Sequence, residues 1–152
     1  MTFMVRDDQF ARHDRIRGFL TDGEPVIAVI LAATDFEWTV RRAILALGTS
    51  PNFDIRAGVL FRCSGLDNYR DAWKAEVTPR FGKRLPEVLA DWSGFRTSFE
   101  LRHRLVHGVT GTTGHKHASA SVDAVLKGST EVADFGSANG IDLFGRLPIR
   151  RR

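Results

Sequence analysis

The chain has 152 residues, one cysteine and a formal net charge of +4, and 43% of its residues are hydrophobic. This is the length of one domain with its own core, and the hydrophobic content is too high for a disordered protein. The lone Cys63 excludes an internal disulfide and a multi-cysteine metal site, so a cytoplasmic location suits the chain. The longest apolar run, Val26 to Ala33, is far shorter than the ~20 residues of a membrane span.

Polarity divides the chain into three parts. Residues 1–20 are polar with charges of both signs, and we interpret them as an N-terminal segment. A helical domain is expected over residues 21–140. Residues 141–152 form a basic C-terminal tail, which ends in three arginines.

Apolar spacing of three and four residues predicts the elements of this domain. The expected helices cover residues 26–47, 66–77, 86–107 and 118–138. A further stretch, 52–63, fits a short helix or an extended segment equally well. No clean alternation of polar and apolar residues predicts a sheet. We therefore expect an all-α protein, a bundle of four or five helices.

The predicted helix over 86–107 carries a charge where its apolar stripe should continue. The stripe runs through Val88, Trp92, Phe95, Phe99 and Val106, with Arg102 between the last two. An inward arginine needs a partner, and Asp35 or Glu37 of the helix over 26–47 has the required charge. His107 follows, and Gly108 then marks the helix end.

The stretch from Arg102 to His107, RHRLVH, resembles the signature of HEPN domains, small helical domains of many RNA-cutting toxins and defence proteins. The signature is an arginine, a polar residue (here His103), three further positions and a histidine near the end of a long helix. The resemblance covers roughly residues 20–110. It implies a homodimer in which Arg102 and His107 are the ribonuclease residues, with His103 in support, facing their symmetry mates across a cleft.

One position departs from the family. Several HEPN toxins carry a tyrosine two residues after the histidine, where a partner enzyme modifies them. This chain has Val109 at that position, which argues against this mode of control. The sequence leaves open whether an antitoxin or another partner protein binds the chain.

An arginine and a histidine are a minimal set for cutting RNA without a metal. The neighbouring 2′-hydroxyl is the nucleophile, His107 would move the proton, and Arg102 would clamp the phosphate as its charge grows. On an ideal helix, residues five apart point about 140° away from one another. The two side chains therefore need either a distorted helix end near Gly108 or a site shared between two copies.

The charge distribution favours RNA as the partner. Residues 80–117 contain seven lysines and arginines against three acids, an excess that equals the net charge of the whole chain. A local basic field suits a polyanion. We expect Arg104 and Lys116 to contact RNA.

Other interpretations remain open. The histidines of this region offer nitrogen ligands, but Arg104 stands where zinc proteases have glutamate, so no metal or other cofactor is expected. Arg102 could instead tie the bundle together, and His107 could serve only the helix dipole. The chain is therefore a candidate endoribonuclease, and the alternative is a catalytically inactive module for dimerisation or for binding RNA or protein.

Overall fold

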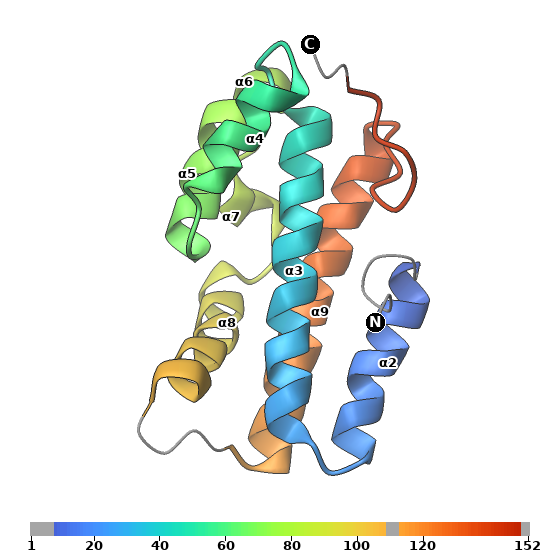
Figure 1. Ribbon diagram of the computed structural model, residues 1–152, viewed down its shortest axis with the longest axis vertical. Coiled ribbons are helices and arrows are strands. Elements are labelled where there is room, and N and C mark those ends of the chain that lie inside the picture. The colour runs from blue at the N-terminus through green and yellow to red at the C-terminus, as the bar shows by residue number, and fades with distance from the viewer. Residues whose placement is uncertain (1–7, 109–112, 150–152) are drawn as a thin grey trace. The chain divides into compact units, whose positions relative to one another are not determined.

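The computed structural model describes residues 8–108 and 113–149, and these residues form eight helices and no strand. The prediction of an all-helical protein is confirmed. The chain divides into two compact units, unit 1 with Met1–Glu37 and Ser93–Thr130 and unit 2 with Trp38–Trp92 and Glu131–Arg152. Figure 1 shows the helices, which are α2 Gln9–Thr21, α3 Pro25–Leu47, α4 Phe53–Phe61, α5 Leu66–Glu76, α6 Thr78–Phe81, α7 Leu85–Val88, α8 Trp92–His107 and α9 His115–Ala138.

Local signals define where α2 ends and α3 begins in unit 1. The side chain of Asp8 accepts a hydrogen bond of 2.8 Å from the amide of Ala11 and so caps the first turn of α2. Gly23 follows α2 with a φ of 78°, a conformation that side chains disfavour. Pro25 then opens α3, where its missing N–H leaves no hydrogen bond unmade.

Three phenylalanines form the centre of unit 1. The ring centroid of Phe36, on α3, lies 4.5 Å from that of Phe95 and 5.7 Å from that of Phe99, both on α8. Helix α9 approaches the same cluster so closely that a Cβ atom on Gly128 would lie 2.3 Å from the Phe95 ring. All three rings are buried, and burying each contributes about 1.5–3 kcal/mol. This packing fixes α8 within unit 1.

Unit 2 is held by side chains that bind backbone carbonyls. Trp73 of α5 is fully buried, and its indole donates a 2.9 Å hydrogen bond to the carbonyl of Lys83. Arg42 of α3 donates to the carbonyls of Leu143 and Gly145. The segment after α9 therefore packs on α3, and Leu143 is buried there.

The helix predicted over residues 86–107 is interrupted, which corrects one expectation. Helix α7 ends at Val88 and α8 begins at Trp92. Between them the buried Leu89 has an extended backbone, with φ −86° and ψ 124°. The amide of Ala90 donates to Glu131 Oε2 at 2.7 Å instead of to a helix carbonyl. A side chain distant in the sequence thus replaces the helical hydrogen bond.

The described residues form more helices than the four or five expected, because several of these helices are short. Residues 52–63 contain α4, whose first turn is capped by Asn52 through a 3.0 Å hydrogen bond from the amide of Ile55. The helix expected over residues 66–77 corresponds to α5, and Thr78 and Pro79 then open the short α6. No helix in the described part of the chain combines the length and apolar content that a membrane crossing requires.

Candidate functional site at the end of α8

Helix α8 presents one face to the core of unit 1 and its last turns to solvent. Phe95, Phe99, Leu101 and Leu105 are its buried residues. Ser121 of α9 adds a 2.8 Å hydrogen bond from its hydroxyl to the carbonyl of Ser98. The apolar face therefore runs to Leu105 and positions the residues after it.

The predicted stripe differs from the observed one at its end. Val106, expected to face inward, is 52% exposed, whereas Leu101 and Leu105 are buried. The reason is that the core of unit 1 covers the Leu101–Leu105 side of the last turns. Val106 is consequently an apolar side chain at the surface, close in sequence to the candidate residues.

The helix stays regular up to His107. The amide of Gly108 donates to the carbonyl of Arg104 at 2.7 Å, a normal helical spacing of four residues. A Cβ atom on Gly108 would lie only 2.2 Å from that carbonyl oxygen, so the helix end requires glycine. The distorted helix end that could bring Arg102 and His107 onto one face is absent from this part of the described chain.

Arg102 pairs with Glu37 of α3 within unit 1. Their Nη2 and Oε1 atoms are 3.2 Å apart, and the two side chains are 31% and 20% exposed. Glu37 is thus the partner among the two acids considered, and it is the only ion-pair partner of Arg102 in the residues described. A guanidinium has five N–H donors, so this pair orients Arg102 and leaves donors for another oxyanion.

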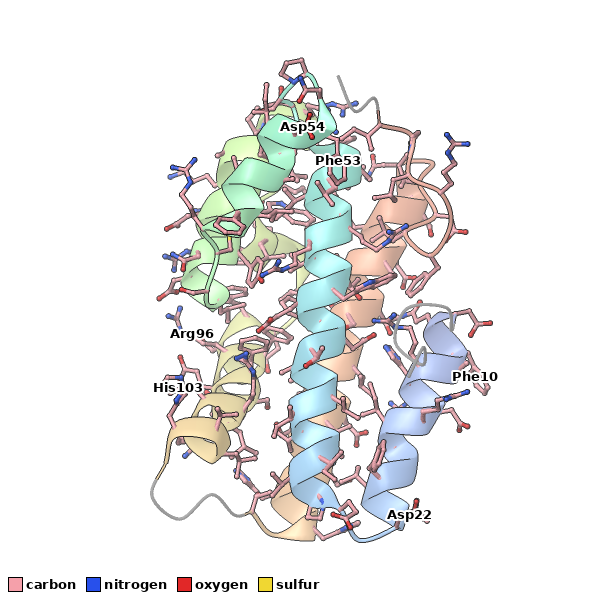
Figure 2. The ribbon with its side chains drawn as sticks, viewed as in Figure 1. Phe10, Asp22, Phe53, Asp54, Arg96 and His103 are labelled. Atoms are coloured by element: carbon pink, nitrogen blue, oxygen red, sulfur yellow. The ribbon has the colours of Figure 1, made fainter. Side chains whose placement is uncertain are left out.

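His103 and His107 lie together on the exposed side of α8. Their ring centroids are 4.6 Å apart, as expected for residues one turn away from each other. Both residues are exposed, and so is Arg104 between them (Figure 2, where His103 is labelled). The last turn therefore carries Arg104 and His107, the residue types that suit the negative end of the helix dipole, and His103 lies one turn earlier.

Arg102 and His107 do not share a face of this regular helix. Five residues turn the helix by about 500°, so the two side chains point about 140° apart. The structure joins Arg102 to Glu37 and His107 to His103, as two neighbouring pairs. A site that uses both Arg102 and His107 on one phosphate therefore needs a second copy of the chain.

Lys116 lies on another element, in the first turn of α9, with His115 and His117 on either side. All three are exposed. Within residues 8–108 and 113–149, no cluster of three or more histidines, cysteines or acids is arranged to hold a metal ion. Val109 and most of the glycine- and threonine-rich stretch after α8 lie outside the described residues, as do the three terminal arginines.

A second polar cluster escaped the sequence analysis. Asp35 of α3 is 1% exposed and binds two residues of α2, accepting from Arg12 Nε at 2.8 Å and pairing with His13 Nε2 at 2.9 Å. Burial alone would raise the pKa of Asp35, but hydrogen bonds and charge from His13 and Arg12 outweigh it and lower that pKa. The available signal was the position of Arg12 and His13 on the same helix face as Ile16.

Comparisons of this chain with family models, with curated proteins and with solved structures found no match.

Proposed function

We propose that the chain is a metal-independent endoribonuclease of the toxin or defence type, a HEPN-like domain that acts as a homodimer. The observation that supports this most is the end of α8, where exposed His103 and His107 stand beside a partly exposed arginine held by Glu37. These residues provide a proton carrier and an oxyanion donor on one rigid element. The resemblance of residues 102–108 to the HEPN signature suggests the catalytic roles of these residues.

The reaction begins with attack of an RNA 2′-hydroxyl oxygen on the adjacent phosphorus. His107 of one copy accepts the hydroxyl proton as the new O–P bond forms. Arg102 of the other copy donates to the phosphate oxygens, whose negative charge increases in the transition state. The bond from phosphorus to the 5′-oxygen breaks, and that oxygen takes a proton from a second histidine or from water. The products are a 2′,3′-cyclic phosphate and a 5′-hydroxyl end.

Neighbouring residues have supporting roles in this proposal. His103 packs its ring 4.6 Å from that of His107 and so restricts its orientation. Glu37 restricts Arg102 in the same way. Arg104 and Lys116, both exposed, contact RNA phosphates outside the reacting one. Their loss should weaken RNA binding without changing the cleavage products.

The decisive test is incubation of the purified protein with total RNA, with and without a chelator, alongside His107→Ala. We expect cleavage that the chelator leaves unchanged, cyclic-phosphate ends, and no cleavage by His107→Ala. The variant should keep its fold, because an exposed histidine at a helix end contributes at most about 1–2 kcal/mol through the dipole. Cleavage by a folded His107→Ala protein would exclude His107 as the proton carrier.

The second candidate is a catalytically inactive HEPN-like module that dimerises or binds RNA or a protein such as an antitoxin. The ion pair between Arg102 and Glu37 favours it, because the arginine already has a structural partner. Val106, exposed on the same helix end, offers an apolar contact. This candidate predicts intact RNA after prolonged incubation, together with self-association or retained RNA binding.

A further inference from the structure

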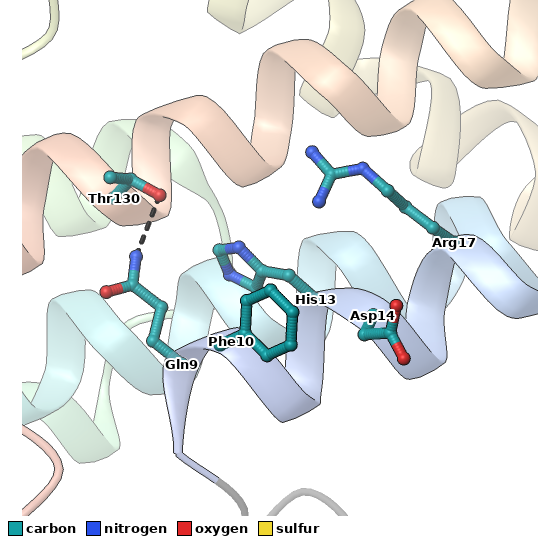
Figure 3. A pocket seen from close by; sticks show the side chains of 6 residues that line it. All are labelled: Gln9, Phe10, His13, Asp14, Arg17 and Thr130. Carbon is teal, nitrogen blue, oxygen red and sulfur yellow. Dashed lines mark hydrogen bonds between the residues drawn. The ribbon is translucent and has the colours of Figure 1, made fainter.

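A pocket of about 300 Å³ lies in unit 1 against α2, away from the residues assigned to RNA cleavage. Figure 3 shows its lining, which consists of Gln9, Phe10, His13, Asp14, Arg17 and Thr130. Five of these residues belong to α2, and Thr130 belongs to α9. The volume is at the lower limit of small-molecule sites, which begin at about 300 Å³.

The helical repeat explains why these residues converge. His13, Asp14 and Arg17 follow Phe10 by three, four and seven positions, which places all four side by side on α2. Gln9 closes one end of the pocket, because its amide donates a 2.7 Å hydrogen bond to the hydroxyl of Thr130. Helical side chains lean toward the N-terminus, and Figure 3 shows Arg17 reaching back over the pocket.

The inner wall of the pocket is held in place by the buried Asp35. A carboxylate only accepts hydrogen bonds, so the His13 Nε2 atom that lies 2.9 Å from Asp35 carries a hydrogen. Arg12 fixes the other oxygen of the same carboxylate. In the described part of the chain Asp35 is the one hydrogen-bond partner of the His13 ring, which leaves Nδ1 for a ligand. A buried network thus supports a polar group at the pocket.

The outer wall combines an aromatic ring with a positive charge. Phe10 is 80% exposed, which is unusual for so large an apolar side chain. The Arg17 side chain is 51% exposed and lies 3.6 Å from Asp123, a loose surface pair that a stronger anion can replace. An aromatic face and a guanidinium about two helical turns apart match a ligand with a flat ring at one end and an anion at the other.

We propose that this pocket binds one nucleoside monophosphate unit, either free or as a nucleotide of single-stranded RNA. The base stacks on Phe10, as bases do on exposed aromatic residues. The phosphate accepts from the guanidinium of Arg17, and His13 Nδ1 offers a further polar contact to the nucleotide from the inner wall. Asp14 accepts a hydrogen bond from a ribose hydroxyl, and Gln9 offers its amide to the base edge.

This proposal does not rest on the cleavage site of α8. The pocket uses other residues of unit 1, and it predicts binding at equilibrium without a reaction. If the protein binds nucleotides in this pocket but cuts no RNA, only the proposed ribonuclease activity is refuted. If the protein cuts RNA but binds no nucleotide in this pocket, only the proposed nucleotide site is refuted.

The experiment is a titration of the full chain by nuclear magnetic resonance with four ribonucleoside monophosphates, a five-nucleotide single-stranded RNA and inorganic phosphate. We expect the mononucleotides or the RNA to shift the signals of Phe10, His13 and Arg17, and inorganic phosphate to bind more weakly. Saturation by mononucleotides identifies a free ligand, whereas binding by the oligonucleotide alone identifies an RNA contact. Absence of shifts at these residues with every nucleotide at millimolar concentration, or equal binding of inorganic phosphate, would overturn the proposal.

Exposed residues supply variants that keep the fold. Phe10→Ala should weaken nucleotide binding about 5- to 150-fold, the range for loss of one stacked base. Arg17→Ala should weaken it by about tenfold or more, because it removes a charged donor. Matched controls are Phe61→Ala, a 90% exposed phenylalanine of α4, and Arg15→Ala, an exposed arginine of α2 outside the pocket. Equal binding by the pocket variants and their controls would also refute the site.

Discussion

At the scale of single residues, the pair of Arg102 and Glu37 has the most direct consequence for function. Arg102→Ala should abolish RNA cleavage and weaken RNA binding, because it removes both a charge and a donor fork. Arg102→Lys should restore binding more than the rate, because lysine keeps only the charge. The melting temperature should change little, since a partly exposed ion pair contributes about 0–1 kcal/mol.

A second arginine of α8 provides the control for Arg102. Arg96 pairs with Glu100 at 3.3 Å, and its side chain is 33% exposed, close to the 31% of Arg102. Arg96→Ala should therefore lower the melting temperature by a similar small amount and leave cleavage intact. If Arg102→Ala unfolds the protein while Arg96→Ala does not, the structural role of Arg102 prevails.

Asp35 is a buried charged residue whose loss should damage the stability of unit 1. Asp35→Ala removes the buried carboxylate that Arg12 and His13 bind, and removing one member of a buried ion pair costs about 3–5 kcal/mol. Asp123→Ala is the control, because Asp123 is 63% exposed in its pair with Arg17 and should change stability by less than about 1 kcal/mol. Chemical denaturation of both variants measures the difference. Equal midpoints for the two variants would contradict this prediction.

The lowered pKa of Asp35 also sets a direction for the pH dependence of stability. Because the pKa is lower in the folded chain than the ordinary value of 3.8, the unfolded chain binds the proton more tightly. The contribution of Asp35 is complete at neutral pH and is lost as the pH falls from about that ordinary value through the lowered pKa. The wild-type protein should therefore lose more stability below pH ~4 than Asp35→Ala does.

At the scale of elements, the approach of α9 to α8 depends on a glycine. Gly128→Ala places a Cβ atom 2.3 Å from the Phe95 ring and should destabilise the protein by about 1–3 kcal/mol through overpacking. Gly18 of α2 has no atom within 4 Å of its Cβ position, so Gly18→Ala should stabilise by about 0.5–1 kcal/mol. Thermal melting of the two variants should give shifts of opposite sign. Two shifts of the same sign would show that the contact at Phe95 relaxes freely.

At the scale of the whole molecule, the angle between Arg102 and His107 predicts a site shared by two copies. Sedimentation at micromolar concentration should show a dimer. If each site takes Arg102 from one copy and His107 from the other, mixing the inactive Arg102→Ala and His107→Ala proteins restores one intact site in each mixed dimer. Random exchange of subunits in this symmetric pair then gives about one quarter of wild-type cleavage.

The control for this mixture is the double variant, which carries both substitutions in one chain. Mixed with either single variant, it cannot form a site with both groups and should stay inactive. A monomer in solution, or no recovery of cleavage after subunit exchange, would falsify the shared site. The mixture can recover RNA cleavage only if the wild-type protein cleaves RNA. The wild-type assay therefore comes first.

Three of the longer helices could be predicted from the sequence because their signals are local. The periodicity that predicted residues 26–47, 66–77 and 118–138 corresponds to α3, α5 and α9, with bounds set by nearby proline and glycine. The pairing of His103 with His107 follows from the helical repeat alone. The candidate residues at the end of α8 were therefore visible before the fold was known, although their roles in catalysis stay a prediction.

The remaining features depend on contacts between distant parts of the chain, which no local pattern contains. Glu131 ends the predicted long helix by binding the amide of Ala90, 41 residues away. The choice of Glu37 for Arg102 and of Asp35 for Arg12 was settled only when α2 and α8 packed on α3. The pocket at α2 closes through Gln9 and Thr130, 121 residues apart. Local patterns in the sequence were enough to locate α3, α5 and α9, because each carries its own apolar repeat and its own stop signals. Tertiary packing decided where the helix expected over residues 86–107 breaks and which charges meet, because burial makes an unpaired charge too costly to tolerate.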